Sequence, residues 1–228
     1  MEKKLGIIIA AAGGSSRFGE TDKMLLPFKG LPLFLFSACK FSTICPQENI
    51  VIVCAKESLE RFKSLAAKYS PGNGFKFAAG GVLRSDSVMN GLACLPEAVE
   101  FVAVHDAARP LASCDLLERC LAAARIHGGA VPAKPVTDTL KRTGRNDRII
   151  ETVCRNDLWR VETPQVFNLS RLRDAYQKAA AVGAEFTDDA AIMEKAGYPV
   201  YIINDPGHNL KVTFKEDVIM LEALSAED

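Results

Sequence analysis

The stretch Leu5-Gly6-Ile7-Ile8-Ile9-Ala10-Ala11-Ala12, followed by Gly13-Gly14-Ser15-Ser16-Arg17, decides the fold. An apolar run without polar alternation is typical of a parallel strand that is buried on both faces. The small residues after it predict a turn in which backbone N–H groups can approach an anion closely. The stretch therefore predicts an α/β protein with a ligand site at the end of its first strand.

Strand-like and helix-like segments alternate beyond this stretch. Residues 50–55, 75–78, 101–105, 129–132 and 200–203 are expected to be strands, and residues 31–41, 57–69, 84–95, 114–127, 169–182, 188–196 and 215–224 helices. This order predicts an α/β fold with a Rossmann-like, mostly parallel sheet flanked by helices. In such sheets ligands bind beyond the carboxyl ends of the strands, so the turns after 5–12 and 101–105 are the expected site.

The alternation breaks between residues 136 and 156. Residues 136–142 and 148–153 resemble two strands around the turn Gly144-Arg145-Asn146-Asp147, which indicates a β-hairpin. It has too few apolar positions to form a core of its own. We therefore expect a single domain over residues 1–228, with 136–156 projecting from it as an arm. Arms of this kind often exchange between subunits.

Composition excludes several classes of protein. With 28 basic and 28 acidic residues the net charge is zero, which favours neither a nucleic-acid nor a membrane partner. No apolar run reaches the length of a membrane span. The basic start of the chain could begin a signal peptide, but the apolar run after it leads into the glycine-rich turn. The seven cysteines lie mostly among apolar neighbours without a CxxC, which indicates reduced thiols and a cytoplasmic protein rather than a zinc site.

The glycine-rich turn matches neither common phosphate-binding motif. Gly14 and Gly19 have the spacing of a P-loop, but Glu20-Thr21 follows where that motif requires Lys-Ser or Lys-Thr, and the Rossmann G-x-G-x-x-G is absent. What remains is a loop of small residues with the cations Arg17 and Lys23, a combination that suits a triphosphate. The alternative is a simple turn with both cations in solvent.

Six segments match one family in order. They are the loop at residues 7–23, Asp86-Ser87-Val88 with Gly91-Leu92, Val104-His105-Asp106-Ala107-Ala108-Arg109-Pro110, Asp138-Thr139, Arg155-Asn156 with Leu158-Trp159 and Thr163-Pro164-Gln165, and Asn209-Leu210-Lys211-Val212-Thr213. Together they resemble the cytidylyltransferases that act on 2-C-methyl-D-erythritol 4-phosphate in the non-mevalonate isoprenoid pathway. Two departures are Asp22-Lys23-Met24, where members commonly have Pro-Lys-Gln, and Val82, where they often have an acidic residue. The second leaves the cytosine contacts near Val82 open.

The resemblance implies an enzyme that joins a polyol phosphate to CTP and releases pyrophosphate. Arg17, Lys23 and Lys211 are the implied catalytic cations. Mg²⁺ is the implied cofactor, held mainly by the CTP phosphates, with Asp106 as a candidate protein ligand.

The resemblance also implies the two binding sites. The nucleotide would contact Ala11, Ala12, Gly13, Gly81, Ser87 and Asp106, and the polyol phosphate would contact Asp106, Thr139, Arg155 and Thr163. In the family the arm reaches into a neighbouring subunit, which implies a homodimer with shared sites.

Structural alternatives remain for several of these residues. Ser87 could cap a helix, Asp106 could form a turn, and Lys211 could be an exposed lysine on an edge strand. Arg155 could pair with an acidic neighbour on the surface. Trp159 is expected to pack in the core.

Two other functions stay open at this point. One is a cytidylyltransferase for a different polyol phosphate, such as ribitol 5-phosphate. The other is an inactive nucleotide-binding regulatory protein, which the presence of Arg17, Lys23, Asp106 and Lys211 disfavours.

Overall fold

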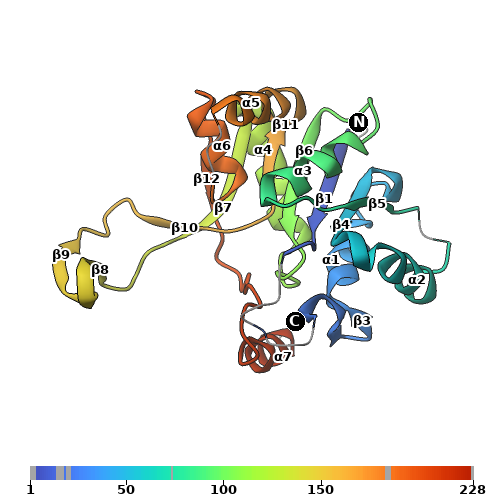
Figure 1. Cartoon of the computed structure of the whole chain (residues 1–228), viewed down its shortest axis with the longest axis horizontal. Helices are drawn as coiled ribbons and strands as arrows, with labels where there is room; N and C mark the ends of the chain where they lie inside the picture. Colours follow the sequence, from blue (N-terminus) through green and yellow to red (C-terminus); the bar gives the residue numbers. More distant parts are fainter. Residues whose placement is uncertain (1–3, 14–17, 19–21, 73, 183–185, 227–228) are drawn as a thin grey trace.

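A central sheet with helices on both faces forms the body of the protein (Figure 1). The computed structural model describes residues 4–13, 18, 22–72, 74–182 and 186–226. The sheet consists of β1 (Leu5–Ala10), β4 (Ile50–Cys54), β5 (Lys76–Ala79), β6 (Phe101–Asp106), β7 (Gly129–Pro135), β10 (Trp159–Val161), β11 (Gln165–Asn168) and β12 (Tyr201–Asn204). Its order is β10-β7-β11-β6-β1-β4-β5, with β12 beside β7. Of these strands, β10 and β11 run antiparallel to their neighbours and the others pair in parallel, so the predicted mostly parallel α/β fold is confirmed.

The first strand is buried on both faces, as its sequence predicts. Ile7 and Ile9 belong to the cluster that packs under α1, α2 and α4, whereas Ile8 belongs to the cluster under α3, α5 and α6. The helices are α1 (Leu33–Phe41), α2 (Leu59–Tyr69), α3 (Arg84–Ala93), α4 (Cys114–His127), α5 (Leu169–Val182), α6 (Asp189–Lys195) and α7 (Asp217–Ser225). Short 3₁₀ turns are η1 (Lys23–Leu25), η2 (Gln47–Asn49), η3 (Lys56–Ser58) and η4 (Arg145–Asp147).

Two regions differ from the expectation. The helix expected from residue 31 begins at Leu33, because Pro32 is extended and pairs with Pro27 in a small hairpin of β2 (Pro27–Phe28) and β3 (Leu31–Pro32). Strands β10 and β11 were not predicted. Trp159, expected in the core, is 37% exposed because β10 is an edge strand.

The predicted hairpin is present as a sheet separate from the body. Strands β8 (Leu140–Thr143) and β9 (Ile149–Val153) pair with each other and extend to one side in Figure 1. Its residues are almost all exposed, including Ile149 and Ile150 at 58% and 65%. We call residues 136–156 the arm below.

The strand order creates a crevice at one edge of the sheet. From β1 the chain runs outward through β4 and β5 and then returns to β6 on the other side of β1. Such a reversal leaves an opening beyond the carboxyl ends of the two adjacent strands. Ala10 and Asp106, the last residues of β1 and β6, are paired neighbours there.

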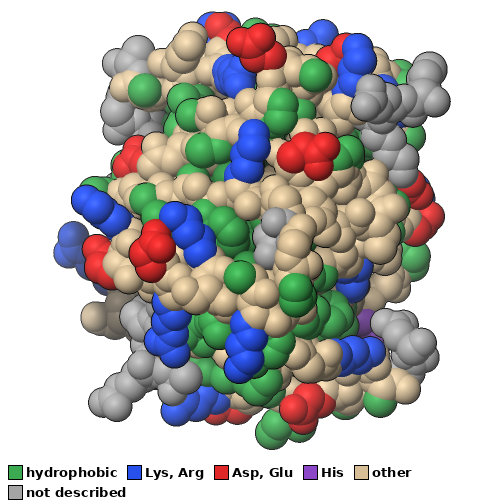
Figure 2. All heavy atoms as spheres, turned by 90° about the vertical axis from the view of Figure 1, so that its right-hand side faces the viewer, with side chains coloured by type: hydrophobic (Ala, Val, Ile, Leu, Met, Phe, Trp, Pro, Cys, Tyr) green, Lys and Arg blue, Asp and Glu red, His purple; other side chains and the backbone are tan. Residues whose placement is uncertain are grey.

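The surface carries mixed charges. On the face seen in Figure 2, basic and acidic side chains are interspersed with hydrophobic and other groups rather than gathered in a continuous basic stripe. Within the described part of the chain, no helix is both long enough and apolar enough to span a membrane.

Candidate functional site

A cavity of about 330 Å³ lies at the carboxyl ends of β1 and β6. It gathers eight of the residues predicted from the sequence, namely Ala11, Ala12, Gly13, Lys23, Gly81, Ser87, Asp106 and Lys211. They come from the turn after β1, from η1, from the loop before α3, from α3 itself, from the end of β6 and from the segment before α7. The crevice expected from the strand order therefore holds most of the predicted site. The predicted Arg17 lies outside the described residues.

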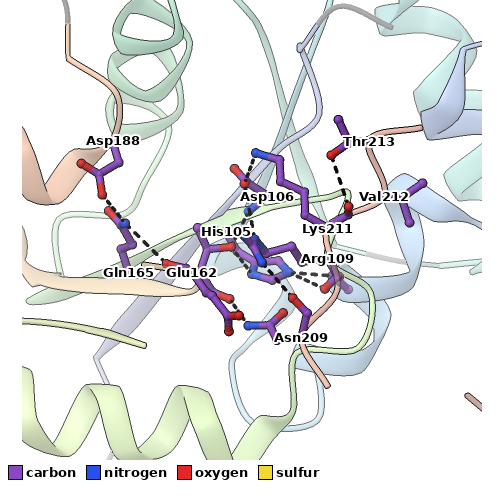
Figure 3. Close-up of polar contacts among 12 residues, drawn as sticks. His105, Asp106, Arg109, Glu162, Gln165, Asp188, Asn209, Lys211, Val212 and Thr213 are labelled. Carbon is purple, nitrogen blue, oxygen red and sulfur yellow. Dashed lines mark hydrogen bonds and ion pairs between the residues drawn. The ribbon is translucent and has the colours of Figure 1, made fainter. Parts of the chain in front are cut away.

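Asp106 and Lys211 form an ion pair at the edge of this cavity (Figure 3). The Nζ of Lys211 donates to Oδ2 of Asp106 at 2.7 Å, and Nε of Arg109 lies 3.7 Å from the same oxygen. Burial would raise the pKa of the Asp106 carboxyl, but Lys211, Arg84 and Arg109 outweigh burial and lower it. Asp106 is therefore a carboxylate at neutral pH, and Lys211 is held over the cavity rather than free on an edge strand.

Residues 209–213, which we call the strap, connect the cationic groups. The backbone of the strap is tied to the turn after β6, because Val212 N–H donates to the carbonyl of Ala108 at 2.8 Å and Arg109 donates to the carbonyl of Asn209 at 2.8 Å. Lys23 is only 9% exposed, and its Nζ lies 3.4 Å from the carbonyl oxygen of Val212. The strap thus places the ammonium groups of Lys23 and Lys211 on one cavity.

The loop between β5 and α3 is held tightly around Ser87. The hydroxyl of Ser87 accepts from Gly81 N–H at 3.1 Å and donates to the carbonyl of Leu83 at 3.2 Å. A Cβ atom on Gly81 would lie 2.2 Å from Cβ of Asp86, so the turn requires glycine. Ser87 lies inside α3 rather than at its cap, and its hydroxyl shapes the cavity wall.

Arg84 also lines the cavity, although it was not among the predicted site residues. Its guanidinium is 2.7 Å from the fully buried Asp189, which also accepts a hydrogen bond from Tyr176. Burial opposes the charge of Arg84, but Asp189 raises the pKa of the guanidinium, so it stays cationic. The sequence signal was a basic residue in the first turn of α3, three positions before Ser87.

Three predicted substrate residues lie outside the cavity lining. Thr139 and Arg155 are exposed at the base of the arm, where Arg155 donates to the carbonyl of Thr137 instead of pairing with an acidic neighbour. Thr163 is 5% exposed, and its hydroxyl is bonded within the protein, to His105 and to the backbone of Asp106.

The residues present fit a metal that binds chiefly through a substrate. Among the described residues, no group of three or more His, Cys, Asp or Glu side chains is arranged so that it could hold a metal ion. Asp106 is the carboxylate in the described lining of the cavity. Mg²⁺ commonly binds through one or two carboxylates together with phosphate oxygens and waters, which agrees with this donor set.

A second carboxyl, that of Glu162, has an unusual environment beside the site. Glu162 is 9% exposed, and burial together with Asp205 raises its pKa to about 7, against Arg109 and Lys134, which lower it. Buried oxygens of Glu162 and Asp205 have no donor among the described residues, so a proton on Glu162 supplies the missing hydrogen bond between the two carboxyls.

The stability of the folded protein should therefore decrease as the pH rises through a defined range. The folded protein binds this proton more tightly than the unfolded chain, so the free energy of unfolding decreases as pH rises from about 4.5 to about 7. Replacing Glu162 with Gln should remove roughly 3 kcal/mol of that decrease, because each pKa unit corresponds to about 1.4 kcal/mol. Urea unfolding at pH 4.5 and pH 8 measures it, with the exposed Glu97→Gln as control. A Glu162→Gln variant with the wild-type pH dependence would contradict the shared proton.

The arrangement is suited to chemistry on polyanions. The cavity presents the side chains of Lys23, Arg84 and Lys211 together with one carboxylate. Cations held before the reaction stabilise charge that develops in a transition state, because little reorganisation is needed. Backbone groups of residues 10–13 offer further contacts to an anion.

Comparisons with known proteins agree with this chemistry. The family model described as 2-C-methyl-D-erythritol 4-phosphate cytidylyltransferase (IspD) matches residues 5–227. The chain is 37% identical over 226 residues to the enzyme of that name from Dictyoglomus thermophilum, covering 98% of this chain and 97% of that one. The crystal structure of the Thermus thermophilus enzyme of that name superposes with a TM-score of 0.79 at 31% identity, covering 97% of this chain and 98% of that one. This protein is a member of the 2-C-methyl-D-erythritol 4-phosphate cytidylyltransferase family.

Proposed function

We propose that this protein joins 2-C-methyl-D-erythritol 4-phosphate to CTP, forming 4-diphosphocytidyl-2-C-methyl-D-erythritol and pyrophosphate. The observation that supports this most directly is the placement of Lys23 and Lys211 on one cavity beside Asp106. The reaction brings two polyanions together, so its main barrier is charge repulsion. Preorganised cations lower such a barrier.

In the proposed mechanism an oxygen of the substrate phosphate attacks the α-phosphorus of CTP. The new P–O bond forms as the bond to the β-phosphate oxygen breaks, and pyrophosphate leaves with the electron pair. The attacking phosphate is already ionised at neutral pH, so no protein base has to remove a proton. Lys23, Lys211 and Arg17 stabilise the negative charge on the α-phosphate and on the leaving group.

The nucleotide would lie between the turn after β1 and the loop before α3. Main-chain groups of Ala11, Ala12 and Gly13 would contact the phosphates and ribose, while Gly81 and Ser87 would read the cytosine. Both segments line the cavity. Mg²⁺ would be held by the phosphates with Asp106, and when bound it neutralises phosphate charge.

The polyol phosphate would bind between Asp106 and an arm. Thr139 and Arg155 lie on the arm, outside the cavity lining of their own subunit, so we propose a homodimer in which each arm serves the partner's site. The exposed Ile149 and Ile150 support this, because a second subunit would cover them. We place the protein in the cytoplasm on the basis of its sequence.

Replacing Arg155 with Ala should raise KM for the polyol phosphate about 10-fold or more and leave KM for CTP nearly unchanged. The expected cause is loss of a planar cation that can donate two parallel bonds to a phosphate. Steady-state kinetics measure both constants, with Arg145→Ala on the same arm as control. Equal weakening of both substrates would contradict a substrate-phosphate role.

Mixed dimers test which subunit Arg155 serves. A subunit carrying Lys23→Met and one carrying Arg155→Ala, each nearly inactive alone at a low concentration of polyol phosphate, would form one intact site between them if the arms are exchanged. Mixing should then restore activity. No recovery, although mixed dimers form, would place Arg155 in the site of its own subunit.

Pyrophosphate release tests the proposed function itself. CTP should support turnover with 2-C-methyl-D-erythritol 4-phosphate, whereas ATP, GTP and UTP should not. Preference for ribitol 5-phosphate would favour the rival substrate. No release with any polyol phosphate in the panel, despite CTP binding, would favour an inactive nucleotide-binding protein.

A further inference from the structure

His105 is buried next to Asp106 but has no role in the mechanism proposed above. It precedes Asp106 at the end of β6 and is 0% exposed. The partners of the ring are a backbone carbonyl and two hydroxyls rather than a carboxylate, and a buried charge without a charged partner is costly, so the ring is neutral. A neutral imidazole has one donor nitrogen and one acceptor nitrogen, and the partners of the ring decide which is which.

The partners of the ring identify its tautomer. Nε2 of His105 lies 3.2 Å from the carbonyl oxygen of Arg109 and 3.3 Å from Oγ of Ser37. A carbonyl oxygen can only accept, so Nε2 carries the proton and Nδ1 is the acceptor. Nδ1 lies 3.1 Å from Oγ1 of Thr163. The hydroxyl of Thr163 must therefore donate its proton to His105.

This assignment uses the single proton of the Thr163 hydroxyl. The same oxygen accepts from the N–H of Asp106 at 3.0 Å. With the side chain only 5% exposed, the hydroxyl has no second proton to give to a substrate phosphate. Oγ1 of Thr163 instead accepts from the backbone of Asp106, and the carboxylate of Asp106 binds Lys211.

These hydrogen bonds form a closed network around Asp106. Nε2 of His105 donates to the carbonyl of Arg109, and Nδ1 accepts from the hydroxyl of Thr163. The oxygen of that hydroxyl accepts from the N–H of Asp106, the residue after His105. Asp106 then binds Lys211, and Arg109 binds the backbone of Asn209 in the strap. Figure 3 shows His105 lying among Asp106, Arg109 and Lys211.

We propose that His105 and Thr163 are positioning residues. The imidazole, protonated on Nε2, orients the hydroxyl of Thr163, and the pair fixes Asp106 and thereby the ammonium group of Lys211 at the reacting phosphate. The inference rests on the proposed role of Lys211. It differs from a direct contact between Thr163 and the polyol phosphate, because it predicts coupling between positions 105 and 163 and an effect on turnover rather than on substrate binding.

A double-mutant cycle separates the two roles. Thr163→Val removes the hydroxyl at nearly constant shape and should lower kcat roughly 10- to 100-fold, since small displacements of a catalytic group are costly. KM for the polyol phosphate should change less than about 3-fold, and Thr163→Ser, which keeps a hydroxyl, should recover most of kcat. His105→Gln can keep a donor near Nε2 but removes the Nδ1 acceptor. In the His105→Gln background, adding Thr163→Val should lower kcat by less than a further factor of about 3, because the hydrogen bond between the two side chains is already lost.

The opposite results would overturn the proposal. If Thr163 contacts the substrate phosphate directly, Thr163→Val raises KM for the polyol phosphate, and its effect multiplies with that of His105→Gln. Wild-type kcat in Thr163→Val would also overturn a positioning role. Thermal unfolding of each variant separates loss of kcat from loss of folded protein.

A measurement on the unmodified protein avoids the risk that a variant does not fold. Long-range ¹H–¹⁵N correlation spectra of histidine-labelled protein distinguish a protonated from an unprotonated ring nitrogen. At about pH 7 His105 should show a protonated Nε2 and a bare Nδ1, because Nε2 faces a carbonyl oxygen and Nδ1 faces the hydroxyl of Thr163. A proton on Nδ1, or an imidazolium at neutral pH, would contradict the proposed hydrogen-bond network. Failure of the pyrophosphate assay would reject the proposed function without altering this spectrum, so the two failures are distinguishable.

Discussion

Replacing Lys23 with Met is expected to lower kcat by about 100- to 1000-fold while the protein stays folded. Met keeps most of the length of the side chain and removes only the charge. A preorganised donor at a developing negative charge typically contributes about 3 to 4 kcal/mol, which corresponds to this range. Lys23 is 9% exposed on the cavity wall, so solvent cannot screen its field as it screens a surface lysine.

The measurement is pyrophosphate release at saturating CTP and polyol phosphate, beside a thermal unfolding curve. Lys56→Met, an exposed lysine on η3, is the matched control and should behave as wild type. Wild-type turnover of Lys23→Met would contradict the assigned role. A rise in KM with an unchanged kcat would show that Lys23 contributes only to substrate binding.

Replacing Lys211 with Met should lower kcat by about 100-fold and also move the pH profile. The charge lost is 2.7 Å from Asp106, where Lys211 helps to lower the pKa of a carboxyl that burial would raise. Without Lys211 the pKa of Asp106 rises. Because the mechanism uses the carboxylate form, activity should disappear at a higher pH on acidification than in the wild type.

The profile of kcat/KM between about pH 4 and about pH 8 measures this shift. Lys215→Met, exposed just beyond the strap, removes a charge of the same sign without touching Asp106 and should leave the profile unchanged. An unshifted acid limb in Lys211→Met, even with reduced kcat, would show that the pair does not govern the state of Asp106 during turnover.

The two lysines therefore test different properties of one cavity. Lys23→Met tests charge stabilisation at the cavity wall, where the ammonium group faces the carbonyl oxygen of Val212. Lys211→Met tests charge stabilisation together with the ionisation of Asp106. Similar losses in both, with a pH shift in Lys211→Met that Lys23→Met lacks, are the expected combined pattern.

Local signals explain why much of the architecture was predictable. Helix α4 was predicted over its full observed range, and its ends are marked locally: Ser113 caps its first turn and Gly128, with φ of 98°, ends it. The first strand was predicted from a continuous apolar run, and its side chains pack on both faces of the sheet. The edge of the sheet that carries the cavity was predictable because ligands bind beyond the carboxyl ends of parallel strands, whereas most of the individual cavity residues were predicted from the family resemblance.

Other elements lacked such signals. Gln165 is 1% exposed in β11, where its side chain bonds Asp188 and the backbone at the start of α6. A polar residue in a short strand resembles a loop in the sequence, so β11 was missed. Strand β10 is exposed, and its alternation Trp159-Arg160-Val161 covers only three residues, which is too short to identify a strand.

Residue order is enough to predict the alternation of strands and helices and the projecting arm, because hydrophobic periodicity and turn chemistry act over a few positions. The pair of lysines was predicted from the motifs that resemble the family. Contacts between distant positions follow only from packing. Arg84 meets Asp189 across 105 residues, and His105 meets Thr163 across 58. Strand order and side-chain burial bring these groups together, and burial also sets their charge, since desolvation and a nearby partner determine whether an ionised form is stable.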